Sequence, residues 1–273
     1  EWGRDVERYC KCCARCQVFY RGKAPRQGEL TDFRVGAPME RLGVDITGPH
    51  PPSSRGYRYI VTAIDYYTRW AEAYPIKNQE ATTVATVSVE QIFFNFGLPL
   101  QILTDQGPNF ESRLFQTMCT MMNVEKLRTT PYEPRTNGMV ERFHRTLNGI
   151  LGKVVEEHQR DWCFRLPYVM ASYRATEHSA TLFTPNFLFL GRETNAPIDL
   201  VLGEDDDQSM ELEEHLDTIR ERMRTAYTLV REYTGRYVCR NKRRYDMKVR
   251  KVTFQRGDWV LYYYPRKRVG KSQ

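Results

Sequence analysis

Three acidic residues could provide the ligands of a divalent-cation site. Asp45 lies in a run where apolar residues alternate as in a strand, and Asp105 follows a short apolar run just before a Gly-Pro turn. Glu141 comes after 35 further residues, in a stretch whose apolar residues recur at helical spacing. Three carboxylates close together raise one another's pKa unless a cation neutralises them. Because all-oxygen ligation favours Mg²⁺ or Mn²⁺ over zinc, the pattern predicts a site for two such ions and a phosphate.

The stretch around Glu141 predicts an amphipathic helix with a basic polar side. Its apolar face comprises Val140, Phe143, Leu147, Leu151 and Val154. The flanking polar face holds Glu141, His144, Arg145 and Asn148. Arg142, Arg145 and Lys153 are candidate contacts to DNA phosphates. His144 is either another phosphate contact or an ordinary surface histidine.

The sequence around these acidic residues resembles that of a known protein family. GVDITGP (43–49), TDQGPNF (104–110) and NGMVERF (137–143) resemble the motifs that carry the catalytic triad of retroviral and retrotransposon integrases. IDYYTRWAEAYPI (64–76) and TPYEPRTNG (130–138) resemble the Ty3/Gypsy branch of the LTR retrotransposons. The resemblance extends over nearly the whole chain.

This resemblance implies that Asp45, Asp105 and Glu141 are the catalytic metal ligands of an integrase. Such an enzyme uses water or a terminal 3′-hydroxyl to attack DNA, first trimming the ends of an element and then joining them to target DNA. A homo-oligomer, action in the nucleus and synthesis as part of a polyprotein are also implied. The chain differs from many family members at Glu133 and Arg135, which replace His and Gln, and at His144, which replaces Asn.

Two rival functions are compatible with the same residues. One is a domesticated integrase-derived protein that binds DNA or protein without catalysis, against which the intact triad argues. The other is a ribonuclease-H-like nuclease acting on RNA–DNA hybrids. The cysteine segment and the basic C-terminal module favour an integrase over that nuclease.

The apolar patterns predict an α/β core between residues 37 and 203. The expected order is three strands, helix, strand, helix, strand, helix, which is the order that the resemblance implies for a ribonuclease-H-like five-stranded mixed sheet. Residues 1–36 are expected to be a remnant of a zinc-binding domain plus a linker, and residues 204–245 an acidic linker and a long helix. Residues 246–273 resemble the start of a small SH3-like DNA-binding barrel.

The N-terminal cysteines suggest part of a zinc site. Cys13 and Cys16 form a C-x-x-C pair, whereas zinc requires four ligands. The resemblance implies that a His pair before residue 1 completes the site, and the chain, which begins with Glu1, is expected to be a fragment. The alternative is two reduced structural cysteines. The remaining cysteines are scattered, which fits a reducing compartment.

The charge distribution points to a polyanionic partner. The net charge is +7, and residues 240–273 carry 12 Lys and Arg against 2 Asp and Glu. A basic tail on a nearly neutral core favours nucleic acid, with Arg240, Lys242, Arg243 and Arg244 as candidate phosphate contacts or a nuclear-import patch. No apolar run approaches the ~18 residues of a membrane span.

Two further features each allow two interpretations. Asp65 also ends a strand, and structural capping is preferred there over metal binding. A heptad seam begins at Leu212 and ends at Tyr237. It predicts either a long helix packed on its own core or a helix that pairs with another subunit.

Overall fold

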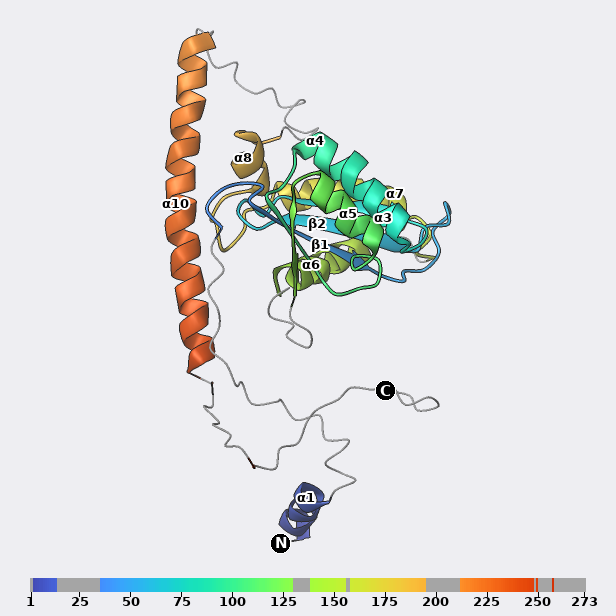
Figure 1. The fold of residues 1–273 in the computed structure, drawn as a ribbon. Helices are drawn as coiled ribbons and strands as arrows, with labels where there is room; N and C mark the ends of the chain where they lie inside the picture. The colour runs from blue at the N-terminus through green and yellow to red at the C-terminus, as the bar shows by residue number, and fades with distance from the viewer. Residues whose placement is uncertain are drawn as a thin grey trace. The chain divides into compact units, whose positions relative to one another are not determined.

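The computed structural model describes residues 2–13, 35–129, 138–155, 158–194, 212–247, 249 and 257 (Figure 1). The chain divides into two compact units, residues 1–32 with 238–273 and residues 33–237. The first unit contains helix α1 (Trp2–Cys12), and the second contains the sheet. Helix α10 (Leu212–Asp246) begins in the second unit and ends in the first.

Five strands form one mixed sheet in the order β3-β2-β1-β4-β5. They are β1 (Arg41–Thr47), β2 (Tyr59–Asp65), β3 (Ala71–Ile76), β4 (Gln101–Thr104) and β5 (Glu125–Arg128). Strands β1, β2 and β3 pair antiparallel, while β4 is parallel to β1 and β5 is parallel to β4. The predicted ribonuclease-H-like α/β core with a five-stranded mixed sheet is therefore confirmed.

Helices cover both faces of the sheet (Figure 1). One face packs on α3 (Ala81–Val87), the π-helix η1 (Ser88–Phe93), α4 (Phe94–Phe96) and α5 (Arg113–Met121). The other packs on α6 (Gly138–Val154) and α7 (Trp162–Arg174). Successive side chains of a strand point to opposite faces of the sheet. The core to which a strand residue belongs therefore shows which face its side chain is on.

Strand β1 shows this alternation and places the first acidic residue. Leu42 and Val44 belong to the core beneath α3 and α5. Gly43 and Asp45 therefore face the opposite side, which α6 covers. The same alternation holds in β2, where Val61 and Ile60 belong to the two opposite cores.

The short helix α8 (Pro185–Leu190) and α10 form a third, smaller core. It contains Tyr67, Leu188, Ala226 and Val230 as buried residues. The Tyr67 hydroxyl donates to the Tyr227 carbonyl at 3.0 Å, and the Tyr227 hydroxyl donates to the Leu188 carbonyl at 3.1 Å. Part of the heptad seam thus packs within its own chain, while pairing with another subunit stays a prediction.

Two apolar residues of the helices are exposed. Leu114 of α5 is 47% exposed, and Val154, part of the predicted apolar face of α6, is 43% exposed. The stripe of α5 that meets the sheet passes through Phe115 and Cys119 instead, and Val154 belongs to the last turn of α6, beyond the buried stripe that ends at Leu151. The free thiols of Cys119 and Cys163 are both buried, as expected of reduced structural cysteines.

The predicted N-terminal zinc site and the predicted C-terminal barrel fall largely on residues that the structure does not describe. Cys13 follows the end of α1, whereas Cys16 lies outside the described residues, so the zinc site stays a prediction. Most of residues 246–273 also lie outside them, and the barrel likewise stays a prediction. None of the described helices is long and apolar enough to cross a membrane.

Candidate active site

Asp45 lies in β1, and Asp105 directly follows the neighbouring parallel strand β4. The last residues paired between the two strands are Gly43 and Leu103. Asp45 and Asp105 each come two residues after this last pair, on strands that lie about 4.8 Å apart where they pair.

The carboxylate of Asp105 is oriented by the turn that follows β4. Its Oδ1 accepts a hydrogen bond from the Gly107 amide at 2.9 Å, which closes an Asx-type turn. The Gln106 side-chain amide donates to the Thr129 carbonyl at 2.9 Å and fastens this turn to the end of β5. Asp105 remains partly exposed and can therefore reach a ligand from solvent.

Helix α6 approaches β1 closely because residue 43 is glycine. A Cβ at Gly43 would lie 2.7 Å from Cγ2 of Val140 and 2.8 Å from Cε2 of Tyr66. Any side chain at this position would push α6 away from the sheet. The contact places Val140 in the first turn of α6 against the strand that carries Asp45.

One turn further along α6, His144 contacts the surroundings of Asp45 directly. Its Nε2 lies 2.7 Å from Oγ1 of Thr62, and its Nδ1 lies 3.9 Å from Oδ2 of Asp45. Thr62 is the β2 residue paired with Asp45, and its hydroxyl is also 3.2 Å from the Asp45 carbonyl. His144 is therefore a half-buried neighbour of Asp45 and not an ordinary surface histidine.

Burial determines the charge state of His144. Desolvation, with a smaller effect from His50, lowers the pKa of His144 to about 4. The imidazole is neutral at pH 7.

The β1–β2 loop packs against α7. The ring of His50 lies 5.4 Å from that of Trp162, and the Trp162 indole donates a hydrogen bond to the Pro51 carbonyl at 2.8 Å.

The third acidic residue and the basic residues of α6 face solvent. Glu141 lies in the first turn of α6 and is exposed, as are Arg142, Arg145 and Lys153. Among the described residues, no three His, Cys, Asp or Glu side chains form a group that could hold one metal ion. Glu133 and Arg135 precede α6 and lie outside the described residues.

The donor set itself fits a hard divalent cation. Asp45, Asp105 and Glu141 offer carboxylate oxygens only, the ligand type that Mg²⁺ and Mn²⁺ prefer. Asp45 Oδ1 accepts from the Ile46 amide at 2.8 Å, and Asp105 uses one oxygen in its turn. A backbone amide thus holds one carboxylate oxygen of each of the two aspartates.

Asp65 has a structural role, as the sequence predicts. It is fully buried and accepts hydrogen bonds from the Thr68 amide at 2.8 Å, the Thr68 hydroxyl at 2.6 Å and the Met39 amide at 3.1 Å. Its carboxylate closes the turn between β2 and β3.

The sequence did not single out Thr62. Its position in β2 carries no motif, and only the antiparallel register opposite Asp45 indicates its place. To predict that register, one would have to know where the β1–β2 loop turns. The Pro- and Ser-rich sequence from 49 to 56 does not specify this position.

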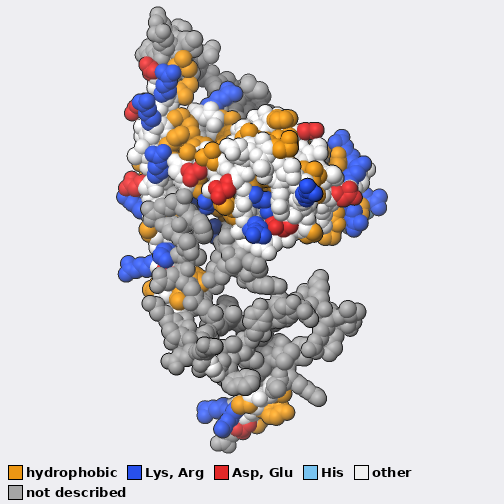
Figure 2. Space-filling view, viewed as in Figure 1, with side chains coloured by type: hydrophobic (Ala, Val, Ile, Leu, Met, Phe, Trp, Pro, Cys, Tyr) orange, Lys and Arg blue, Asp and Glu red, His pale blue; other side chains and the backbone are white. Residues whose placement is uncertain are grey.

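Basic side chains also gather away from α6. Figure 2 shows Lys and Arg at the right-hand end of the core, where Figure 1 draws the loop between β1 and β2. Arg55 and Arg58 of this loop are exposed. The C-terminal candidates Arg240, Arg243 and Arg244 are also exposed, while Lys242 pairs with Asp246 at 3.0 Å.

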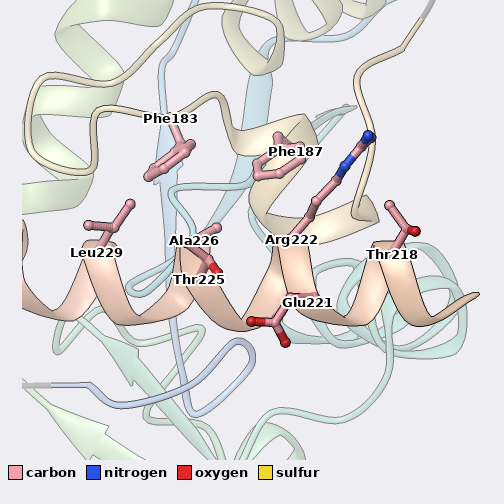
Figure 3. Close-up of a pocket in the computed structure, with 8 residues that line it drawn as sticks. All are labelled: Phe183, Phe187, Thr218, Glu221, Arg222, Thr225, Ala226 and Leu229. Carbon is pink, nitrogen blue, oxygen red and sulfur yellow. The ribbon is translucent and has the colours of Figure 1, made fainter.

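A separate groove of about 470 Å³ lies between α8 and α10 (Figure 3). Phe183 and Phe187 face Ala226 and Leu229 across it, and Glu221 points away from the aromatic rings (Figure 3). It contains none of the three acidic residues and is not the candidate active site.

In a comparison with known protein families, residues 36–134 match the Integrase core domain. The chain is 28% identical over 223 residues to a retrovirus-related Pol polyprotein from transposon 412 of Drosophila melanogaster, covering 82% of this chain and 18% of that protein. It is 32% identical over 201 residues to the Gag-Pol polyprotein of avian reticuloendotheliosis virus, covering 73% of this chain and 16% of that protein.

The fold also has a solved counterpart. A simian T-cell lymphotropic virus intasome, determined in complex with the PP2A regulatory subunit B56 gamma, aligns with a TM-score of 0.51 at 20% identity. The alignment covers 73% of this chain and 69% of that chain. Against both polyproteins above, the chain spans less than a fifth of their length.

Proposed function

The chain contains an integrase core domain of the retroviral and retrotransposon kind, and we propose that it cuts and joins DNA phosphodiesters. The observation that supports this proposal is the parallel pairing of β1, which carries Asp45, with β4, which Asp105 directly follows. Glu141 lies in the first turn of α6, the helix that packs closely on Gly43 of β1.

Asp45, Asp105 and Glu141 would hold Mg²⁺ or Mn²⁺. A pair of such ions, when bound, activates the attacking oxygen and stabilises the leaving oxygen of an in-line displacement. The chain's own part is to fix the carboxylates. The Ile46 amide donates a hydrogen bond to one carboxylate oxygen of Asp45, and the Gly107 amide donates one to Asp105. The remaining oxygens are thereby oriented before any ligand arrives.

The DNA would be bound mainly through phosphates. Arg142 and Arg145 project from the same helix as Glu141 and are exposed. Lys153 is exposed in the last turn of that helix. Arginine forms bidentate hydrogen bonds with phosphate oxygens and needs no particular base sequence.

The remaining parts of the proposal rest on the resemblance. The substrates are the DNA ends of an element and its target DNA, and the chain acts as a homo-oligomer in the nucleus. Zinc would be bound only where a His pair upstream of Glu1 completes the site of Cys13 and Cys16.

The experiment uses the full chain, Mn²⁺ and a branched DNA that reports the reversal of strand joining. Asp45→Asn, Asp105→Asn and Glu141→Gln keep side-chain shape and remove ligand charge, so each should reduce product by at least about 100-fold. Duplex affinity should change little, because phosphate contacts come from Lys and Arg. The matched control is Glu90→Gln on the opposite face of the sheet, which should leave activity intact.

Two results identify the rival functions. A wild-type chain that binds duplex DNA and never cleaves it under these conditions identifies a non-catalytic, domesticated protein. A chain that cleaves RNA–DNA hybrids and leaves branched DNA untouched identifies a ribonuclease-H-like nuclease.

A further inference from the structure

The candidate site contains a series of polar contacts that metal binding by the three carboxylates does not explain. It runs from Thr62 in β2 through the imidazole of His144 in α6 to the carboxylate of Asp45 in β1. Thr62 is fully buried, and the side chain of His144 is 15% exposed. A polar contact of 2.7 Å in such surroundings is a hydrogen bond whose loss is costly.

Thr62 has one hydroxyl proton to donate, and the acceptor of that proton determines which ring nitrogen of His144 is protonated. If Thr62 donates to the Asp45 carbonyl at 3.2 Å, His144 must donate from Nε2, and the bare Nδ1 then faces Oδ2 of Asp45. If Thr62 donates to Nε2 at 2.7 Å, the ring carries its proton on Nδ1, which faces the same oxygen.

The second alternative is favoured by charge. Both alternatives make the 2.7 Å contact a hydrogen bond, and the first also keeps the 3.2 Å contact to the Asp45 carbonyl. The second instead places an N–H dipole beside the Asp45 carboxylate, where the first places a nitrogen lone pair, and this charge–dipole attraction outweighs one long hydrogen bond. The separation of 3.9 Å between Nδ1 and Oδ2 is too long for a hydrogen bond and is electrostatic in nature.

We propose that His144 is a positioning residue for Asp45, held by Thr62 as the Nδ1–H tautomer. The Ile46 amide donates a hydrogen bond to Oδ1, and the His144 N–H attracts Oδ2 electrostatically from 3.9 Å, so the two together favour one orientation of the carboxylate. Partners that orient a ligating carboxylate in this way raise metal affinity. The metal part of this inference rests on the proposed function; the tautomer does not.

The tautomer is tested directly in the full chain labelled with ¹⁵N-histidine. Long-range ¹H–¹⁵N spectra at pH 7 distinguish protonated from bare ring nitrogens, and the loss of one set of signals in His144→Asn assigns them among the five histidines. We expect a protonated Nδ1 and a bare Nε2, unchanged in Thr62→Ser. A protonated Nε2 overturns the proposal, whatever the protein catalyses.

The positioning role is tested by Mn²⁺ titration followed by electron paramagnetic resonance, without DNA. Thr62→Val keeps the side-chain shape and removes the hydroxyl, so its Mn²⁺ affinity should fall about 10-fold, as should that of His144→Ala. Thr62→Ser should restore most of it. Thr146→Val, which removes an exposed hydroxyl from the same helix, is the matched control and should bind like wild type.

The outcomes separate this inference from the proposed function. Wild-type affinity in both Thr62→Val and His144→Ala, with the fold retained by circular dichroism, overturns the positioning role alone. Wild-type affinity in Asp45→Asn removes Asp45 as a metal ligand and overturns the proposed function together with this role. Because Thr62→Val is nearly isosteric, it remains informative if His144→Ala fails to fold.

Discussion

At the scale of single residues, two aspartates near strand ends differ in what surrounds them. Asp65 is fully buried and accepts three hydrogen bonds from Thr68 and Met39. Burial raises its pKa, and those hydrogen bonds partly offset the rise. The side chain of Asp45 is 17% exposed and faces α6. Only Asp45 is placed to share a ligand with Asp105.

Asp65→Asn should lower the free energy of unfolding by about 1–3 kcal/mol, because one acceptor facing N–H and O–H donors becomes a donor. DNA joining per folded molecule should be unchanged. Chemical denaturation measures the first effect and single-turnover kinetics the second. A folded Asp65→Asn protein that is as inactive as Asp105→Asn would show that the site is assigned to the wrong aspartate.

His178 gives the folded chain a pH dependence of its own. Desolvation, followed by the charges of Arg69 and Arg142, lowers the pKa of His178 to about 4. Its Nδ1 accepts a hydrogen bond from the Ala180 amide at 3.2 Å, which a protonated ring could not accept. The folded protein therefore favours the neutral ring.

The unfolded chain takes up a proton on His178 near its ordinary pKa of 6.5, and the folded chain does so only near 4. The stability that the neutral ring contributes is thus complete above pH 6.5 and is lost as pH falls toward 4. His178→Asn keeps an acceptor for Ala180 and does not titrate. Melting temperatures at pH 7 and pH 5 should differ less in this variant than in wild type, and parallel losses would contradict the assignment. His144, whose pKa is shifted in the same direction, leaves a residual slope.

At the scale of elements, the packing of α6 on β1 determines whether the three carboxylates can act together. Gly43 leaves no room for a side chain between Val140 and Tyr66. By contrast, Gly149 on the exposed side of α6 has no heavy atom within 4 Å of an added Cβ. The two glycines form a natural pair for a test.

Gly43→Ala should destabilise the protein by about 1–3 kcal/mol through overpacking, and should reduce Mn²⁺ affinity because α6 and Glu141 move from β1. Gly149→Ala should stabilise it by about 0.5–1 kcal/mol, as expected for a glycine in a helix, and leave metal binding unchanged. Denaturant unfolding and Mn²⁺ titration measure both. Equal metal affinity in the two variants would mean that the close approach of α6 is not needed.

The elements themselves were largely predictable, and their contacts were not. Alternation in β1 placed Gly43 and Asp45 on one face, because burial on one side of a strand leaves a period of two in the sequence. The exposed Leu114 shows the limit, since apolarity alone does not reveal which stripe of α5 meets the sheet. The contact between His144 and Thr62 joins residues 82 positions apart and has no local signal.

At the scale of the whole molecule, the basic C-terminal region is the main electrostatic feature of the sequence. Arg240, Arg243 and Arg244 are exposed, and Lys242 pairs with Asp246. Release of counterions from DNA makes the affinity of such contacts strongly dependent on salt.

Changing Arg240, Lys242, Arg243 and Arg244 together to Gln should weaken duplex binding and flatten its salt dependence. Each lost phosphate contact removes about 0.9 from the slope of log affinity against log salt. Arg222→Gln with Arg224→Gln is the control from an exposed earlier part of α10. Fluorescence anisotropy across a salt series measures the slope. An unaltered slope would assign the phosphate contacts to other surfaces, such as α6.

The position of bound Mn²⁺ in crystals of the full chain would show whether Asp45, Asp105 and Glu141 form one metal site. Anomalous scattering at the manganese edge locates the ions independently of activity. We expect manganese contacted by Asp45 and Asp105, with Glu141 completing the ligands from α6. Manganese bound elsewhere, or a soaked crystal in which these three carboxylates hold none, would contradict this expectation.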